Sequence, residues 1–210
     1  MKNGTEAAVT RFSGAGNQAD RTLMEGVKNG ELSLLGELFE RHHPSLFNFF
    51  RRLVRNRSIA EDLVQEVFVR MLKYRHTFRA GGEFVPWMYA LARNAATDHF
   101  RSRPRELPED PDAREPAAAI PLPTDTLQRT EQARTLQRAL GRLPVDRRET
   151  ILLARCSGLD YAQIGELLGI SQGAVKGRVH RAMVDLKKAY RAEGLRAIRG
   201  GARRGDLDEL

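Results

Sequence analysis

The chain has 210 residues, enough for one domain or two small ones. Its 35 Lys and Arg residues outnumber its 27 Asp and Glu residues, and the net charge of +8 favours a polyanionic partner, either nucleic acid or an anionic membrane surface. The single cysteine excludes a disulfide framework and a cysteine-rich zinc site, and no apolar run is long enough to span a membrane. The N-terminus lacks the apolar segment of a secretory signal, so we expect a soluble, cytoplasmic protein.

Charge and prolines divide the chain into segments. Residues 104–125 carry a net charge of −4 and six of the nine prolines, whereas the blocks before and after them carry +5 and +6. Proline breaks helices and central strands, so this acidic stretch is predicted to be an extended linker. Its acidity fits either simple solvation or mimicry of nucleic acid in a basic channel. We predict flexible tails over 1–20 and 195–210, and two helical domains over 21–103 and 126–194.

The first block begins with helical periodicity. Apolar residues recur every three or four positions from Leu35 to Leu53, which predicts a helix with one apolar stripe. Pro44 lies inside this pattern and is expected to kink the helix or split it in two. His42 lies on the apolar stripe, so we expect it in the core rather than at a metal site.

Two further helices are expected in the first block. Ser58 and Glu61 have the spacing of a capping box, which predicts a helix beginning at that serine. The polar residues on the side of this helix away from its apolar face are expected to meet solvent or a partner: Asp62, Gln65, Glu66 and Arg70. The first three are expected to have no intrachain role. A third helix is predicted from about Phe84 to Arg101.

Aromatic residues in the first block alternate with arginines. Phe78, Phe84 and Trp87 lie among Arg75, Arg79 and other arginines. Most of these rings are expected in the core, but an interleaved pattern also suits a surface for single-stranded nucleic acid, where rings stack on unpaired bases and guanidinium groups meet phosphates. By itself this pattern is not specific.

The second block predicts a helix-turn-helix. Helices are expected over 127–143, ended by Pro144, and over 146–157. The next stretch, LDYAQIGELLGISQGAVKGRVHRAMVDLKKAY, has Gly165 where two helices cross, Gly169 at a turn that favours positive φ, and Ser171 as a helix cap. The second helix of such a motif enters the major groove and reads base edges. The residues placed to do so are Ser171, Gln172, Gly173, Lys176, His180 and Arg181.

The order of these parts resembles an RNA polymerase sigma factor of the extracytoplasmic-function (ECF) group of the sigma-70 family. AEDLVQEVFVRML resembles the polymerase-binding helix of that group, FVPWMYALARNAATDHFRSR its −10-element helix, and the region from LGRLP to DLKK its −35-binding domain. The resemblance implies an all-α protein with a sigma-2-like bundle and a sigma-4-like helix-turn-helix domain on a flexible linker. It implies no cofactor and no catalysis. Its expected partners are core RNA polymerase and promoter DNA, and it allows an anti-sigma factor as a third.

The resemblance also implies roles for individual residues. Those expected to bind polymerase are Asp62, Gln65, Glu66, Phe68 and Leu72. Those expected to capture the melted −10 strand are Arg75, Phe78, Arg79, Trp87, Asn94, Asp98 and Arg101. The second helix of the C-terminal motif is expected to read the −35 duplex, through the six residues given above. Because the two domains would be joined only by a flexible linker, the isolated chain is expected to bind promoters poorly.

Two other function classes compete with this interpretation. An ordinary helix-turn-helix regulator with a sensing or dimerising N-terminal block explains residues 126–191 equally well, but not AEDLVQEVF. An enzyme is disfavoured because the sequence has no P-loop, no GxSxG and no metalloprotease spacing around His42 and His43. Cys156 has no CxxC partner and is expected to be a buried structural thiol.

Overall fold

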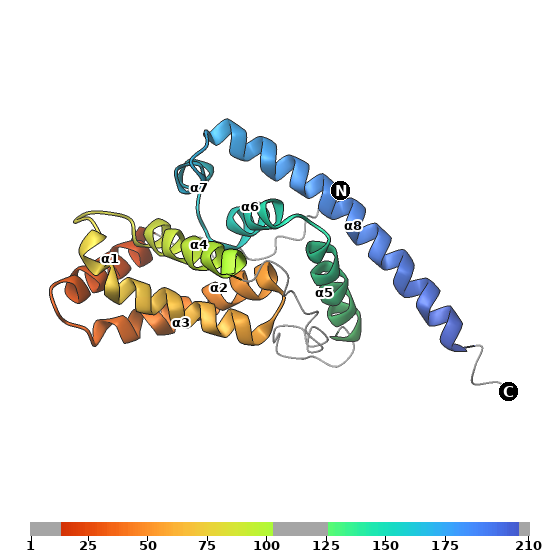
Figure 1. Ribbon diagram of the computed structural model, residues 1–210, viewed down its shortest axis with the longest axis horizontal. Helices are drawn as coiled ribbons and strands as arrows, with labels where there is room; N and C mark the ends of the chain where they lie inside the picture. The colour runs from red at the N-terminus through yellow and green to blue at the C-terminus, as the bar shows by residue number, and fades with distance from the viewer. Residues whose placement is uncertain (1–13, 103–125, 206–210) are drawn as a thin grey trace.

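The computed structural model describes residues 14–102 and 126–205, and the described part of the chain is helical, without strands (Figure 1). The expected all-α fold class is confirmed. The linker predicted over 104–125 lies outside the described residues. No helix in the described ranges is long and apolar enough to cross a membrane. The helices in chain order are α1 (Gly14–Lys28), α2 (Leu34–Val54), α3 (Arg57–Lys73), the 3₁₀ turn η1 (Arg75–Thr77), α4 (Phe84–Ser102), α5 (Thr126–Gly141), α6 (Val145–Cys156), α7 (Tyr161–Leu168) and α8 (Gln172–Gly205).

Helices α1 to α4 form a bundle around an aromatic-rich core. Phe49 and Phe50 of α2 are fully buried, and the ring of Tyr89 on α4 meets Phe49 edge-on, with 5.4 Å between ring centroids. Edge-to-face aromatic pairs of this kind add to the stabilisation from burial. Burial raises the pKa of the Tyr89 phenol, so the hydroxyl stays neutral within this core.

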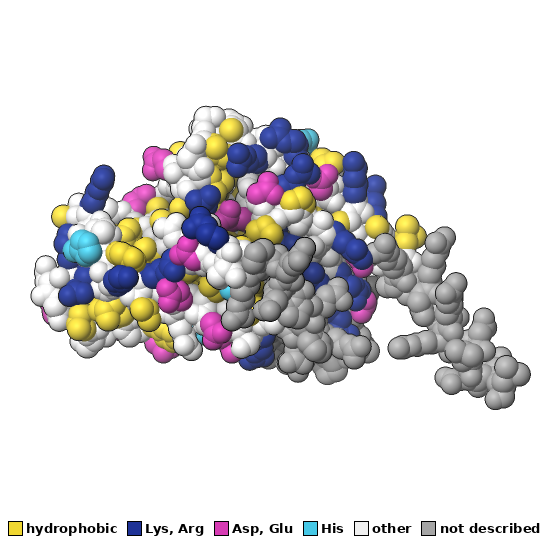
Figure 2. Space-filling model, in the orientation of Figure 1, with side chains coloured by type: hydrophobic (Ala, Val, Ile, Leu, Met, Phe, Trp, Pro, Cys, Tyr) yellow, Lys and Arg dark blue, Asp and Glu magenta, His cyan; other side chains and the backbone are white. Residues whose placement is uncertain are grey.

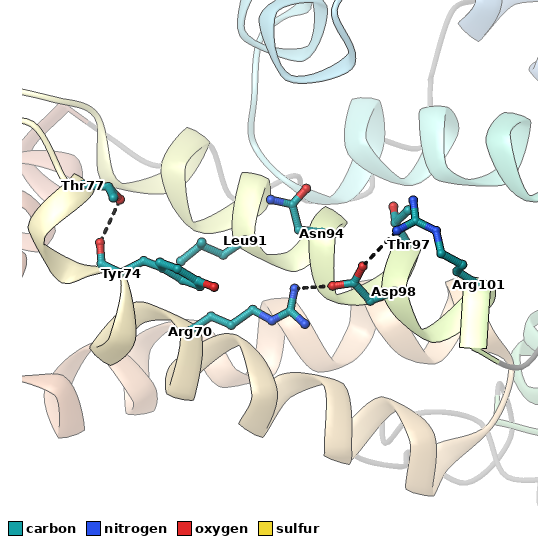
Figure 3. Close-up of a pocket in the computed structure, with 8 residues that line it drawn as sticks. All are labelled: Arg70, Tyr74, Thr77, Leu91, Asn94, Thr97, Asp98 and Arg101. Carbon is teal, nitrogen blue, oxygen red and sulfur yellow. Dashed lines mark hydrogen bonds and ion pairs between the residues drawn. The ribbon is translucent and has the colours of Figure 1, made fainter.

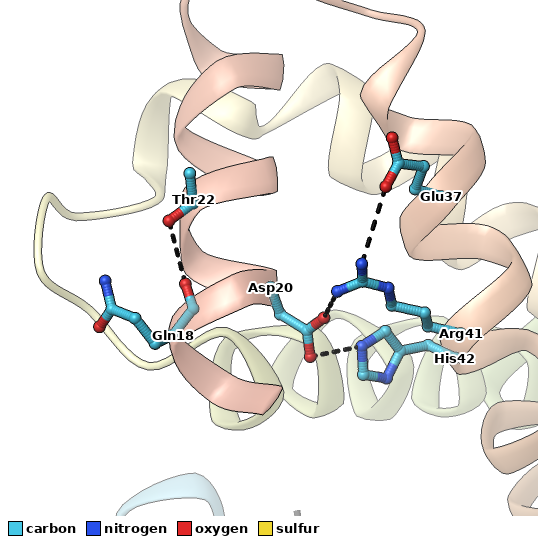
Figure 4. A network of polar contacts seen from close by, with 6 residues as sticks. All are labelled: Gln18, Asp20, Thr22, Glu37, Arg41 and His42. Atoms are coloured by element: carbon cyan, nitrogen blue, oxygen red, sulfur yellow. Dashed lines mark hydrogen bonds and ion pairs between the residues drawn. The ribbon is translucent and has the colours of Figure 1, made fainter. Parts of the chain in front are cut away.

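A buried polar network ties α1 to α2 (Figure 4). Asp20 of α1 is almost fully buried; one carboxylate oxygen contacts Nε2 of His42 at 2.8 Å, and the other accepts a hydrogen bond from Arg41 at 3.1 Å. Desolvation lowers the pKa of His42, and the charge of Asp20 offsets only part of that effect. His42 lies in the core, as the apolar stripe predicted.

The second group of helices has its own small core. Leu140 of α5, Ile151 of α6, and Ala182 and Leu186 of α8 belong to one cluster of buried residues. Helix α8 is long and extends past α5 as a straight rod (Figure 1). Residues 195–205, which belong to the predicted C-terminal tail, are part of this helix.

The first group of helices, α1 to α4, and the second group, α5 to α8, pack against each other. Leu152 and Leu153 of α6 and Ile164 of α7 belong to the same buried cluster as the core of α1 to α4. Arg148 of α6 is 3% exposed and donates to the carbonyl of Leu53, near the end of α2, at 2.6 Å. The two predicted groups of helices are therefore in contact in this structure, and the segment that joins them, 104–125, lies outside the described residues.

The structure narrows or corrects three local predictions. Of the two outcomes expected at Pro44, a kink or a split, the split is excluded because α2 runs through the proline as one helix. The cap of α3 is Asn56, whose side chain accepts from the Ile59 amide at 3.0 Å, and Ser58 already lies inside the helix. Helix α1 begins at Gly14, so the later part of the predicted N-terminal tail is helical and includes the buried Asp20.

Candidate nucleic-acid interface

The turn between α7 and α8 has the geometry that its sequence predicts. Asp160 caps α7 by accepting from two backbone amides, and Gln163 reaches back to the Asp160 amide to complete a capping box. Gly169 ends α7 in the left-handed conformation at φ 66°. A Cβ at Gly165 would lie 2.7 Å from the carbonyl oxygen of Ile170, so only glycine allows this close approach. Ser171 accepts from the Ala174 amide at 3.2 Å and caps α8.

The first turns of α8 present one exposed, polar face. Val175 and Val179 are buried and hold the helix against its neighbours, which turns the residues between them outward. Figure 2 shows Lys and Arg side chains along the visible surface of this helix. The residues predicted to read the −35 duplex are all exposed: Ser171, Gln172, Gly173, Lys176, His180 and Arg181. A capped, exposed and basic helix after a tight turn is the element that enters a major groove.

A second exposed face lies on α3. Asp62 and Gln65 are exposed and Glu66 is half-exposed, as expected of a partner-binding surface. Glu66 does have an intrachain partner, because Arg70 donates to its carboxylate at 2.6 Å, which corrects the expectation that it has none. Phe68 is 7% exposed and belongs to the core, whereas Val69 is 59% exposed and lies on this face with the half-buried Leu72. The contact expected at Phe68 came from the family resemblance; in this structure its ring faces the core, whereas the neighbouring Val69 is exposed.

The loop between η1 and α4 carries aromatic residues that mostly face inward. Phe78 is 1% exposed and packs against Phe84 and Trp87. Its ring therefore cannot stack on a base in this arrangement, contrary to the expectation that it contacts the −10 strand. Trp87 is half-buried and its indole donates to the Thr77 hydroxyl at 3.3 Å. Arg79, the next residue after Phe78, is exposed.

Helix α1 holds this loop in place. Lys28 donates to the carbonyl of Phe78 at 2.7 Å, Arg21 donates to the carbonyl of Gly82 at 3.0 Å, and the Gly81 amide donates to Glu25 at 3.3 Å. These contacts span 50 or more residues of sequence, and no local pattern announces them. The loop is therefore fixed in position by α1 before any ligand arrives.

A cavity of about 490 Å³ lies between α3 and α4 and collects three of the residues predicted to capture the −10 strand (Figure 3). Asn94, Asp98 and Arg101 line it from α4, one turn apart from one another. The other lining residues are Arg70, Tyr74, Thr77, Leu91 and Thr97, and none of them is among the individual residues predicted for the −10 strand. The ring of Tyr74 is 37% exposed. Together with the amide, carboxylate and guanidinium groups that line the cavity, it suits an unpaired nucleotide.

The remaining predicted residues lie outside this cavity. Arg75 turns back and donates to the Leu72 carbonyl at 2.7 Å. Arg79 and Trp87 line a second cavity of about 270 Å³, which Glu166 of α7 also lines. Gln163 of α7 donates to Glu83, just before α4, at 2.6 Å. One end of the predicted strand-binding surface is therefore covered by the helix-turn-helix.

The described residues offer no metal site, since no group of three or more His, Cys, Asp or Glu side chains converges. Cys156 is half-buried, with its sulfur 3.5 Å from a guanidinium nitrogen of Arg52. It therefore lies where the two groups of helices meet.

The fold and these surfaces define a class: an all-α DNA-binding protein with a helix-turn-helix and a second polar surface on its N-terminal bundle. Comparison with known families is more specific. The model of Sigma-70 region 2 matches residues 38–106, and that of Sigma-70 region 4 matches residues 133–186. The RNA polymerase sigma factor CarQ of Myxococcus xanthus is 35% identical over 167 residues, covering 79% of this chain and 94% of CarQ. The ECF sigma factor SigX of Bacillus subtilis is 30% identical, covering 72% of this chain and 80% of SigX.

Solved structures agree with this assignment. CnrH in complex with the cytosolic domain of CnrY has a TM-score of 0.63 and 25% identity, covering 83% of this chain and 98% of that one. The sigma factor RpoE of Bartonella quintana in complex with the anti-sigma factor NepR has a TM-score of 0.59 and 25% identity, covering 74% and 96%. The chain belongs to the sigma-70 family of RNA polymerase sigma factors, in its ECF group. It is thus a transcription initiation factor that directs RNA polymerase to specific promoters, and the simple regulator is not favoured.

Proposed function

We propose that α8 reads the −35 duplex, that the cavity between α3 and α4 with the loop before α4 captures the melted −10 strand, and that the exposed face of α3 binds core polymerase. The observation that carries this proposal is the presence of three exposed polar surfaces, one on α8, one between α3 and α4, and one on the outer face of α3. The −35 surface follows a capped turn, the −10 surface is a nucleotide-sized cavity, and the polymerase surface adds the exposed Val69 to three polar residues.

In this proposal residues 21–103 act as the sigma-2-like domain, extended backward to include α1, and residues 126–194 as the sigma-4-like domain. The protein works in the cytoplasm with the polymerase and catalyses no reaction itself. Two structural relatives were solved with the cytosolic domain of CnrY and with the anti-sigma factor NepR. An anti-sigma factor is accordingly a further partner that we propose for this chain.

The packed arrangement of the two groups of helices supports a change of shape on polymerase. Gln163 of α7 donates to Glu83, the residue before α4, and Glu149 of α6 pairs with Arg93 of α4 at 3.5 Å. The two promoter elements lie about 25 base pairs apart, or about 85 Å along B-form DNA at 3.4 Å per base pair. Because α6 and α7 are held against α4 in this arrangement, we infer that the helix-turn-helix moves away from α4 when the chain engages both elements in the initiation complex.

Run-off transcription tests this function. The chain is mixed with core RNA polymerase and a library of random promoter sequences, and transcripts are recovered and sequenced. A sigma factor yields transcripts that share −35 and −10 motifs and is recovered with core polymerase on size-exclusion chromatography. Absence of both a polymerase complex and a shared motif would refute the proposal.

A further inference from the structure

Arg70 connects two surfaces that the proposed function assigns to different ligands. It lies on α3 one turn after Glu66 and faces α4 across the cavity (Figure 3). Its Nε donates to Oε1 of Glu66 at 2.6 Å, and its Nη1 lies 2.9 Å from Oδ2 of Asp98. Glu66 belongs to the exposed face of α3, and Asp98 lines the cavity on α4. One guanidinium group therefore bridges the proposed polymerase-binding face and the proposed −10 site.

The bridge is built more firmly than an ordinary surface ion pair. The Arg70 side chain is only 19% exposed, whereas Glu66 and Asp98 remain about half exposed. Burial opposes the charge of the guanidinium, but the hydrogen bonds and charges of the two carboxylates outweigh burial and raise the pKa of Arg70. Arginine suits this position because its planar fork presents several donors in fixed directions, which a lysine ammonium does not.

We propose that Arg70 is a positioning residue that couples polymerase binding to capture of the −10 strand, by holding Asp98 in place from its contact with Glu66. This inference rests on the proposed function, because it takes from there the polymerase face on α3 and the strand site on α4. Asp98 also lies 3.8 Å from Arg101, so its carboxylate sits between two guanidinium groups. Its orientation then sets where the acceptor oxygens and the Arg101 side chain point in the cavity.

The direction of the coupling follows from carboxylate chemistry. A carboxylate has two oxygens and can accept from two partners at once. A cationic or amide donor on polymerase can bind Glu66 while Arg70 keeps its bond to Oε1. That contact would hold Glu66 in one rotamer, which in turn holds Arg70 and Asp98, so that less ordering is left for the DNA strand to impose. Polymerase binding should therefore strengthen strand capture through this bridge.

The experiment uses the full chain bound to core polymerase, with a promoter recovered by run-off from a random library and carrying a pre-melted −10 region. Core affinity is measured first for each variant, and strand capture is then measured at saturating core. The variants are Arg70→Met, Arg70→Lys, Glu66→Ala and the double variant Glu66→Ala with Arg70→Met. Arg57→Met is the matched control, because Arg57 forms the same type of pair with Glu61 on the same helix and does not line the cavity.

We expect Arg70→Met to weaken strand capture about tenfold, the loss expected for one charge-assisted hydrogen bond, while −35 duplex binding by the same complex is unchanged. Arg70→Lys should recover part of that loss, and Arg57→Met should behave as the wild type. Glu66→Ala should weaken capture even at saturating core, and the double variant should be no worse than Arg70→Met alone.

Wild-type capture by Arg70→Met would overturn the bridge, as would losses in the double variant that multiply those of the single variants. A fall in −35 binding that matches the fall in capture would reduce Arg70 to a structural role and also overturn it. Failure of the wild-type chain to bind core polymerase would instead refute the proposed function, so the two failures are distinguishable.

Discussion

Arg148 is the side chain whose removal should most clearly separate the two groups of helices. It is buried on α6, donates to the Leu53 carbonyl of α2 at 2.6 Å, and donates to the carbonyls of Gly141 and Leu143 at 3.2 and 3.0 Å. Burial, together with the nearby charge of Arg55, lowers the pKa of Arg148 to about 10, so the group is still protonated near neutral pH. All three acceptors therefore meet a charged donor.

The size of the effect follows from these bonds. A hydrogen bond from a charged donor contributes about 1.5–3 kcal/mol, and part of this is offset by the cost of burying the guanidinium group. Arg148→Met keeps much of the apolar volume and removes all three bonds, for which we expect a loss of about 3 kcal/mol in unfolding free energy. Of these three bonds, only the one to Leu53 joins the two groups of helices. Losing it should cost about 2 kcal/mol, which would raise the equilibrium constant for separation of the two groups about 30-fold.

Hydrogen exchange and a thermal melt of the isolated chain measure the two effects. Arg148→Met should lower the melting temperature and speed exchange at the end of α2 and along α6. Arg147→Met is the matched control, because Arg147 is its neighbour, is exposed and pairs with Asp185 on the surface. Such surface pairs contribute about 1 kcal/mol or less. If both variants melt and exchange alike, the buried guanidinium does not hold the groups together.

Other predictions concern pH, the loop and the −35 surface. The folded-state pKa of His42 lies below the ordinary value of 6.5, so the neutral imidazole stabilises the fold fully above pH 6.5, and this contribution is lost as the pH falls below 6.5. Melting temperatures measured from about pH 8 to pH 5 should therefore fall with pH, and His42→Gln should flatten that dependence. Lys28→Met removes the bond to the Phe78 carbonyl and should cost about 1 kcal/mol, with faster hydrogen exchange over residues 78–82 and unchanged −35 binding; unchanged exchange would exclude that role. Lys176→Ala should reduce promoter use several-fold, whereas Lys188→Ala should change little. Footprints of both variants on matched and scrambled −35 sequences measure this, and equal losses on every sequence would show that α8 is only a non-specific basic surface.

The sequence by itself determined those features whose signals are local. The turn after α7 depends on glycine at a positive φ, a glycine at a close backbone approach and a serine cap, and each is within a few residues of its partner. The exposed face of α8 followed from helical periodicity, which places Val175 and Val179 inward. Helix α4 was likewise predicted within a residue of its observed ends. The order of these local signals also carried the resemblance to the ECF group, and the comparisons confirmed it.

The tertiary structure decided which of two plausible residues faces inward. Phe68 and Val69 are adjacent apolar residues, and only the packing of α3 against its neighbours buries one and exposes the other. Phe78 is an aromatic residue among arginines, which suggested base stacking, but Phe84 and Trp87 approach it from the next helix and cover its ring. The pattern of residues along the chain cannot show whether an apolar side chain is covered by the protein core or by a bound ligand.

Contacts between distant segments also came only from the tertiary structure. In the sequence Asp20 belongs to a polar tail, and only the fold shows that it contacts His42 and Arg41 of α2. Arg148 is likewise one of many arginines in the sequence, and only the fold shows that it donates to the Leu53 carbonyl near the end of α2. Charged side chains are ordinarily exposed, so sequence alone predicts solvent for them. Asp20 is buried here because the imidazole of His42 and the guanidinium of Arg41 replace water, and Arg148 because backbone carbonyls do; these partners are assembled only when the helices pack.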